Sequence, residues 1–231
     1  AEQANCAKWL NQNSIWSADN QRSFSDYLAG FNSNQRRNIK KERKSILNSG
    51  ITITTSLGKE IDQQRMEKMH DLYELHCAKW GIWGSKYLSK SFFERLASPK
   101  YQDNLVLFNA HQGDSHEAFA MSLCITNKKK LWGRYWGSEL EIENLHFELC
   151  YYTPISWAID NGIDSFDPGA GGSHKLRRGF QLQSNISLHR WYNKKMDYII
   201  RTWLPKANEL MIQEIDDINK ELPFKAKLTS M

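Results

Sequence analysis

The most constraining feature of the chain is the order of apolar segments in its middle third. Three short segments rich in aliphatic, aromatic and β-branched residues follow one another, at residues 105–110, 117–126 and 130–136. Turn sequences separate them, so they are predicted to be three successive strands. Residues 145–161 then have the pattern of a helix that is apolar on nearly every side, which indicates a buried helix. The pattern predicts an α/β fold.

Helix and strand patterns alternate through the rest of the chain as well. Further helices are predicted at residues 1–16, 24–31 (with Ser23 as N-cap), 34–48, 62–80, 90–96 and 194–221, and further strands at 51–55, 163–167 and 184–191. No internal repeat occurs, and 231 residues are enough for a full hydrophobic core. We therefore expect a single domain over residues 1–231.

A glycine-rich turn follows the strand predicted at 163–167. Its glycines would let a ligand approach the backbone closely: Gly169, Gly171 and Gly172. Ser173 is expected to cap a short helical turn that Gly179 closes. Lys175, Arg177 and Arg178 crowd this turn beside His174. Cations at a helix N-terminus oppose its dipole unless an anion lies between them. The turn is therefore predicted to bind an anion, and the alternative is a solvated basic loop.

The helix predicted at 145–161 carries two ionisable residues, His146 and Glu148, in its first turn. Buried ionisable groups must be paired or have shifted pKa values, which makes these two candidates for acid–base chemistry. The alternatives are that Glu148 pairs with Arg134 or another cation, and that His146 is a hydrogen-bonded structural residue. Pro154 is expected to kink the helix or to mark a break after Thr153.

The helix predicted at 34–48 is strongly basic. Arg36, Lys40 and Lys44 follow i, i+4 spacing, and Arg37 and Lys41 extend an adjacent stripe. The net charge of the whole chain is +5. Such a face suits tRNA phosphates or an anionic membrane surface, although charged stripes are often only solvated surface. No base-reading motif accompanies it.

Three blocks of the chain resemble the FemAB-like predicted N-acyltransferases, a family described for peptidoglycan biosynthesis or recognition within the GNAT-like acyltransferase superfamily. These blocks are Trp132-Gly133-Arg134-Tyr135-Trp136-Gly137, Leu145-His146-Phe147-Glu148-Leu149-Cys150-Tyr151-Tyr152, and Pro168-Gly169-Ala170-x-Gly172-x-His174-Lys175-x-x-Arg178-Gly179-Phe180. Supporting matches lie at residues 36–43, Phe92-Phe93, Ser187-x-His189 and Leu222-Pro223-Phe224. Two positions depart from the family pattern: Gly171 replaces a glutamine, and Ser173 replaces a glutamate, so any chemistry of that glutamate is in question here.

The resemblance implies a GNAT-like fold, with a mixed central sheet flanked by helices and a long C-terminal helix. Because family members are usually longer, the chain is expected to be the C-terminal part of a larger protein. The implied reaction moves an acyl or aminoacyl group from acyl-CoA or aminoacyl-tRNA to the amine of a small molecule or peptide. No metal is predicted.

The resemblance also suggests roles for particular residues. Glu148, His174 and His146 are the candidates for acid–base catalysis. The donor or another anion would be held by Arg134, Gly169, Gly171, Gly172, Lys175, Arg177 and Arg178. Tyr135, Trp136 and His189 would form the pocket wall. Residues 133–144 lack the glycine-rich pattern that GNAT enzymes use for the coenzyme A pyrophosphate, and they carry three glutamates. Acidic side chains would repel a pyrophosphate, which weighs against an ordinary acetyl-CoA reaction. Fem-type enzymes, which take the aminoacyl group from a charged tRNA, also depart from that pattern, and the anion site is then expected at the turn of residues 169–178.

Two other classes of function remain open. The chain is alternatively a non-catalytic module that recognises cell-wall peptide or sugar, or a protein that binds nucleic acid or a membrane surface through its basic helix.

The last predicted helix has an apolar stripe that packs against the domain, against a missing N-terminal domain, or against a second copy in a homodimer. The four cysteines show no paired spacing and indicate reduced thiols in a cytoplasmic protein. No apolar run approaches the roughly 20 residues of a membrane span.

Overall fold

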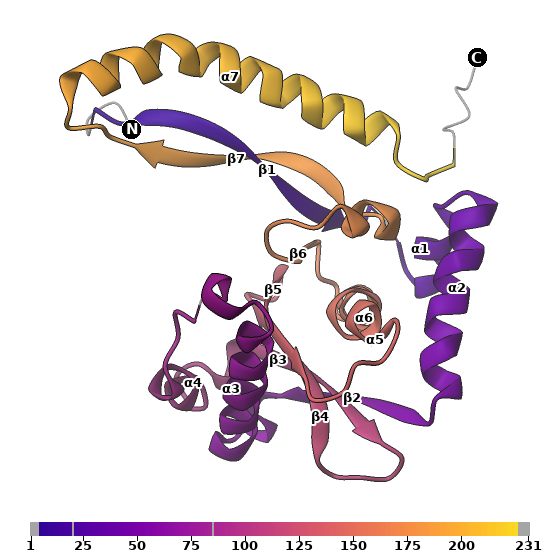
Figure 1. Ribbon diagram of the computed structural model, residues 1–231. Coiled ribbons are helices and arrows are strands. Elements are labelled where there is room, and N and C mark those ends of the chain that lie inside the picture. The colour runs from indigo at the N-terminus through magenta and orange to yellow at the C-terminus, as the bar shows by residue number, and fades with distance from the viewer. Residues whose placement is uncertain (1–4, 20, 85, 226–231) are drawn as a thin grey trace. The chain divides into compact units, whose positions relative to one another are not determined.

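The computed structural model describes residues 5–19, 21–84 and 86–225. The chain forms two compact units (Figure 1). The larger unit comprises residues 17–169, and the smaller unit combines the residues up to 16 with those from 170 onward. Among the described residues, no helix is both long and apolar enough to cross a membrane.

The larger unit is built on a mixed sheet, as predicted. Its strands are arranged in the order β2 (Ile51–Leu57), β3 (Leu105–Gln112), β4 (Ala118–Thr126), β5 (Lys130–Ser138) and β6 (Ser165–Asp167). The first four pair in antiparallel fashion and β6 runs parallel to β5. Strands β3 and β4 are buried along nearly their whole length. Strands of this kind are covered on both faces of the sheet.

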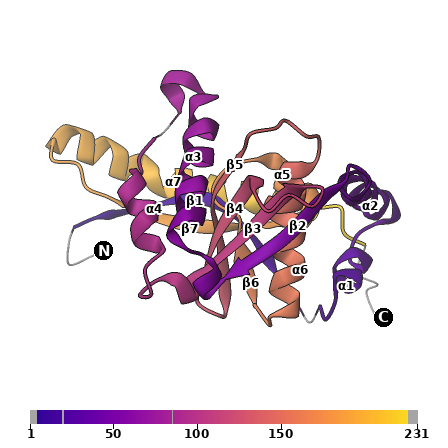
Figure 2. The ribbon, with the colours of Figure 1, turned by 90° about the horizontal axis from the view of Figure 1, so that it is seen from below.

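Helices of the larger unit cover both faces of this sheet (Figure 2). They are α1 (Phe24–Ala29), α2 (Ser33–Asn48), α3 (Gln63–Ala78), α4 (Lys90–Leu96), α5 (Leu145–Phe147) and α6 (Thr153–Asp160). Leu107 of β3 belongs to the core cluster with residues of α3. Its neighbour Phe108 contacts Trp157 of α6, with ring centroids 6.3 Å apart. Successive residues of one strand therefore pack against helices on opposite faces of the sheet.

Side-chain caps begin three of these helices. Ser23 accepts a hydrogen bond from the backbone N–H of Asp26, as predicted, and Asp62 accepts one from Arg65 at the start of α3. Asn32 caps α2. Each cap satisfies an N–H group that has no partner inside its helix.

The predicted helix at 145–161 is present, but it contains a wide turn. A π-helical segment, Glu148–Tyr152, joins α5 to α6. Pro154 lies in the first turn of α6, directly after that segment. A proline ring clashes with the carbonyl four residues before it in a regular helix. The wider turn before Pro154 avoids this conflict, which is the physical form of the predicted irregularity.

The smaller unit pairs two strands that lie far apart in the sequence. Strand β1 (Ala7–Ser17) runs antiparallel to β7 (Gln181–His189), with Ala7 opposite His189. The helix predicted at residues 1–16 is therefore wrong over its described part, and residues 1–4 lie outside that part. The apolar spacing of Trp9 and Leu10 suggested a helix, but pairing with β7 satisfies the backbone instead, and tertiary context overrides weak local propensity.

Helix α7 (Lys194–Lys220) completes the smaller unit and is tied to both strands. The amide of Asn208 accepts from the N–H of Leu10 and donates to the carbonyl of Lys8. Asn219 makes the same two bonds with the backbone of Leu182. Figure 1 shows α7 running along the two strands. The helix continues through Pro205. Of its predicted apolar stripe, Leu204 and Ile215 are buried, whereas Trp203 and Leu210 are exposed.

Candidate active site

The most distinctive polar group of the larger unit is the carboxylate of Glu148, at the start of the π-helical segment. Its side chain is only 6% exposed. Arg43 of α2 donates from Nη2 to Oε1 at 2.9 Å, and its Nε lies 3.1 Å from both carboxylate oxygens. Thr153 Oγ1 donates to Oε1 at 2.9 Å. Charge-assisted contacts of this kind are the strong hydrogen bonds of proteins.

Arg43 is the residue of this group that sequence reasoning missed. The predicted partners of Glu148 were Arg134 or another cation, and the structure identifies that cation as Arg43. The basic helix was interpreted as a cationic surface, yet Arg43 lies at helical spacing from Ile39 and Ile46, both buried in α2. That spacing was a readable signal, because residues three and four apart share one helix face.

Aromatic side chains complete the surroundings of this ion pair. The Arg43 guanidinium lies 4.3 Å from the centroid of the Phe24 ring, within cation–π range. The hydroxyl of Tyr152 donates to the carboxylate of Glu42, the residue before Arg43. Two contacts therefore join helix α2 to the π-helical segment. They are the ion pair of Arg43 with Glu148 and the hydrogen bond from Tyr152 to Glu42.

His146 lies two residues before Glu148, and its ring is surrounded by aromatic side chains. Its ring centroid is 5.2 Å from that of Trp136 and 5.3 Å from that of Tyr151. Trp136 is therefore on the α5 side of the sheet. Tyr135 contacts Tyr73 and Phe93 instead, on the α3 side. The two residues predicted to share one pocket wall lie on opposite faces, because successive side chains of a strand alternate.

Arg134 is exposed and occupies an irregular position in β5. Gly133 pairs with Cys124 and Tyr135 pairs with Leu123, so Arg134 is the extra residue of a β-bulge. Bulges redirect side chains and are frequent near functional sites. Arg134 does not form the ion pair with Glu148.

The glycine-rich turn has the backbone that its sequence predicts. Gly169, Gly171 and Gly172 all have positive φ, at 88°, 72° and 84°. A Cβ on Gly172 would lie 2.5 Å from the His174 ring. Gly172, and not Ser173, occupies the N-cap position of the 3₁₀ turn Ser173–Arg178, so the capping prediction is wrong. That position requires a positive φ, which serine rarely adopts.

The cations of this turn, in the smaller unit, differ in exposure. Lys175 is buried and donates to the carbonyl of Ala170 at 3.1 Å, and Arg178 is buried and donates to that of His174 at 2.9 Å. Arg177 is exposed. Burial lowers the pKa of His174 below its usual value, and the nearby charges of Arg178 and Lys175 lower it further. His174 is therefore neutral at pH 7.

His189 lies at the end of β7 in the same unit. Its Nε2 is 2.8 Å from Ser187 Oγ, and its ring lies 5.4 Å from that of Trp9 and 5.7 Å from that of Trp191, centroid to centroid. The predicted site residues thus fall into two groups. Arg134, Tyr135, Trp136, His146, Glu148 and Gly169 belong to the larger unit, and Gly171, Gly172, His174, Lys175, Arg177, Arg178 and His189 belong to the smaller one.

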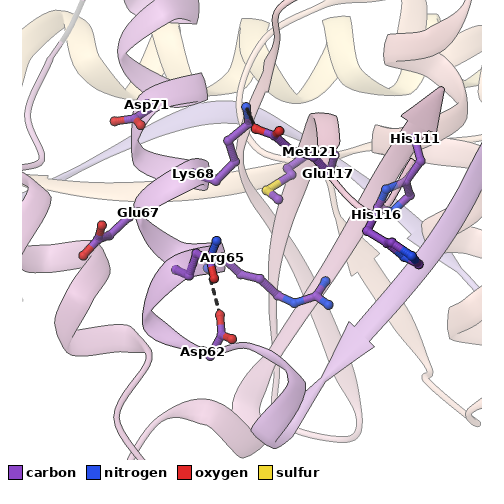
Figure 3. Close-up of a pocket in the computed structure, with 11 residues that line it drawn as sticks. Asp62, Arg65, Glu67, Lys68, Asp71, His111, His116, Glu117 and Met121 are labelled. Atoms are coloured by element: carbon purple, nitrogen blue, oxygen red, sulfur yellow. Dashed lines mark hydrogen bonds and ion pairs between the residues drawn. The ribbon is translucent and has the colours of Figure 1, made fainter. Parts of the chain in front are cut away.

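A separate hollow of about 560 Å³ lies beside α3 in the larger unit (Figure 3). Asp62, Arg65 and Lys68 line it from the start of α3, and His111 and His116 line it from β3 and the following turn. His111 is 7% exposed, and its Nε2 lies 2.9 Å from Thr54 Oγ1. None of the predicted site residues lines this hollow, and no motif or spacing in the sequence marks it.

The cysteines and metal-binding side chains show no composite site. All four cysteines are thiols and not disulfides, and burial raises the pKa of Cys124 far above its usual range. Within residues 5–19, 21–84 and 86–225, no group of three or more His, Cys, Asp or Glu side chains is placed to hold a metal ion.

The chain is similar to a protein family and, in its fold, to solved structures. The family model named FemAB-like, described as peptidoglycan biosynthesis/recognition, matches residues 1–226. The crystal structure of FemX is similar with a TM-score of 0.51 and 12% sequence identity, over 74% of this chain and 59% of that one. The structure of L-PGS from Bacillus licheniformis is similar with a TM-score of 0.55 and 10% identity, over 94% of this chain and 68% of that one. At these identities the likeness concerns the fold. No curated protein sequence matches.

Proposed function

Because the chain belongs to the FemAB-like family, we propose that it is an N-acyltransferase that moves an aminoacyl group from a charged tRNA to the amine of a peptide. An acyl group carried by coenzyme A is the second donor class. The chain spans 59% of the FemX chain. We propose that it is one GNAT-like domain of a longer, cytoplasmic protein, since the family model runs through both compact units.

The observation that carries this proposal is the buried, oriented carboxylate of Glu148. In the reaction, the amine lone pair attacks the ester carbonyl and forms the new C–N bond, the acyl C–O bond to the tRNA ribose breaks, and the proton lost by the amine passes through the base to the released ribose oxygen, which leaves as a hydroxyl. Arg43 and Thr153 direct three of their four contacts to Oε1, leaving Oε2 with a single 3.1 Å contact. A carboxylate oxygen has two lone pairs, so Oε2 retains capacity to accept the proton.

His174 is the second candidate for proton transfer. Its lowered pKa keeps the imidazole neutral at pH 7, and a neutral imidazole can accept a proton from an attacking amine. His146, held among Trp136 and Tyr151, is assigned the positioning of the helix start rather than proton transfer.

The region after β5 supports a tRNA donor over coenzyme A. Two of its glutamates pair with lysines of α3 and its C-cap, Glu139 with Lys68 at 2.6 Å and Glu141 with Lys79 at 3.0 Å. No cradle of glycine N–H groups for a pyrophosphate is apparent in that acidic sequence. We assign the donor phosphates to the exposed Arg177 of the glycine-rich turn, with Lys175 and Arg178 holding that turn in shape. The exposed Arg134 of the larger unit is a separate candidate for an anion.

The test is transfer of a radiolabelled aminoacyl group from tRNA, or an acetyl group from acetyl-CoA, to a peptidoglycan-type peptide with a free amine. Glu148→Gln should lower kcat by about 10²–10⁴-fold, the usual contribution of a general base. Glu143 is an exposed glutamate in the turn before α5, so Glu143→Gln is the matched control and should leave kcat unchanged. His174→Gln tests the second candidate in the same assay.

Three results would change the proposal. Wild-type kcat for Glu148→Gln across the pH range would remove its role as base. Transfer from acetyl-CoA alone would make the donor an acyl-CoA. No transfer from either donor, with peptide or muropeptide binding retained, would make the protein a recognition module.

A further inference from the structure

The loop between α3 and α4 exposes an unusual concentration of large apolar side chains. Trp80 is 62% exposed, Ile82 92%, Trp83 82% and Tyr87 84%. We call residues 80–84 together with 86 and 87 the aromatic loop. Single exposed apolar residues are ordinary on protein surfaces, whereas a contiguous exposed group marks an interaction site. The exposed surface of this loop therefore has the composition of an interaction site.

The backbone of the aromatic loop is held in place even though its side chains are exposed. The Tyr73 hydroxyl accepts hydrogen bonds from the backbone N–H groups of Tyr87 and Leu88. Gly84 lies so close to the end of α3 that a Cβ there would be 2.0 Å from the carbonyl oxygen of Cys77. These contacts fix the loop at the end of α3, which projects at the top of Figure 2. The exposed side chains are thus presented on a supported backbone.

The charges around the aromatic loop are balanced. Lys79 pairs with Glu141 at 3.0 Å, Lys86 with Glu74 at 2.5 Å and Lys90 with Glu67 at 3.3 Å. The loop therefore presents apolar and aromatic surface with little net charge. It differs in this respect from the exposed face of α2, where Arg37, Lys40, Lys41 and Lys44 are cationic.

We propose that the aromatic loop inserts into the interfacial region of a lipid bilayer and docks the protein on a membrane surface. Trp and Tyr favour this region, because their rings are apolar and their N–H or O–H groups remain near water. A stable protein interface needs about 800 Å² and 20–30 residues from each partner, far more than four side chains on a projecting loop provide. A bilayer needs no complementary surface. The association is peripheral and is driven by burial of apolar area rather than by charge.

The proposal goes beyond the acyltransferase function and does not depend on it. The experiment is sedimentation of the full chain with vesicles of zwitterionic phosphatidylcholine at about 0.1 M and about 0.5 M salt. The higher salt concentration strongly screens charge interactions between the protein and the vesicle. No donor or acceptor is present, so failure of the proposed reaction leaves the result interpretable. We expect binding that changes little with salt.

The decisive variant is Trp80→Ser combined with Trp83→Ser. Each lost aromatic side chain should weaken partitioning by roughly tenfold, giving about 100-fold for the pair. Trp203→Ser removes a comparably exposed tryptophan from α7 and is the matched control, expected to bind as the wild type. Equal thermal melting of the three proteins shows that the exposed substitutions leave the fold intact.

Several outcomes would overturn the proposal. One is absence of the wild-type protein from the vesicle pellet, which would leave a protein or peptide as the partner of the loop. Another is equal sedimentation of the double variant and the wild type. A third is binding that disappears at high salt and on Arg37→Gln with Lys41→Gln, because the basic face of α2 would then carry the association.

Discussion

The ion pair between Arg43 and Glu148 should stabilise the larger unit, and Arg43→Met tests this most directly. The substitution keeps much of the side-chain volume but leaves a carboxylate that is 6% exposed with Thr153 as its remaining hydrogen-bond donor. Breaking a fully buried pair costs about 3–5 kcal/mol. The Arg43 side chain is 32% exposed, so water can partly replace it. We therefore expect a loss of about 2–3 kcal/mol.

The measurement is urea-induced unfolding of four proteins that form a double-mutant cycle: wild type, Arg43→Met, Glu148→Gln and the double variant. Because the partners are in direct contact, the double variant should be more stable than the sum of the single effects predicts, by about 1–2 kcal/mol. In a chain of this size, Arg43→Met should lower Tm by about 5–10 °C. Lys40→Met, on the exposed face of the same helix, should change stability by no more than about 0.5 kcal/mol.

Two results would contradict this reasoning. If Arg43→Met unfolds within about 0.5 kcal/mol of the wild type, water replaces the guanidinium fully. If the two single effects add, the residues do not interact energetically, and the contacts in the structure carry no stability.

Three further expectations follow from the smaller unit. Gly172→Ala should lose about 1–3 kcal/mol in thermal unfolding, because φ is 84° and the new Cβ would meet the His174 ring, whereas Gly171→Ala, with open space around it, should cost less; equal losses would contradict the steric reason. Since the folded pKa of His174 lies below its unfolded value, stability should fall as pH drops below about 6.5. His174→Gln should flatten that fall in urea titrations, and an unchanged slope would show that another group causes it. Asn208→Ala should cost about 1–2 kcal/mol, because two backbone groups of β1 lose their partner; Asn208→Asp, which keeps only the acceptor, should retain part of this stability.

Local signals predicted most helices and strands well. Helix α4 occupies the predicted residues 90–96, and β5 begins at the predicted Lys130. Ser23 caps α1 as expected. In these cases the apolar period and the capping residue lie within one element, so neighbouring residues contain the required information.

Two misreadings have a common origin in contacts that local patterns do not show. The spacing of apolar residues in β1 predicts a helix. This prediction is wrong because the strand's partner, β7, lies more than 160 residues further along the chain, where a local pattern cannot reveal it. The N-cap of the 3₁₀ turn was assigned to the hydroxyl of Ser173, but the backbone needs positive φ one residue earlier. In the first case the backbone conformation is set by pairing with a distant strand, and in the second by the positive φ of Gly172; neither follows from the preference of a single side chain.

The sequence by itself determined the α/β class, the family and the position of the buried Glu148, because long apolar patterns and the glycine-rich turn are local properties. The spacing from Ile39 and Ile46 places Arg43 on the buried face of α2, but only the tertiary structure decided that this face meets Glu148. Arg43 lies 105 residues from Glu148, and one cation among many in a basic helix is selected solely by the face that packs inward. The exposure of the aromatic loop was likewise decided by the fold, since Tyr73 and Cys77 hold its backbone while leaving its apolar side chains outside the core.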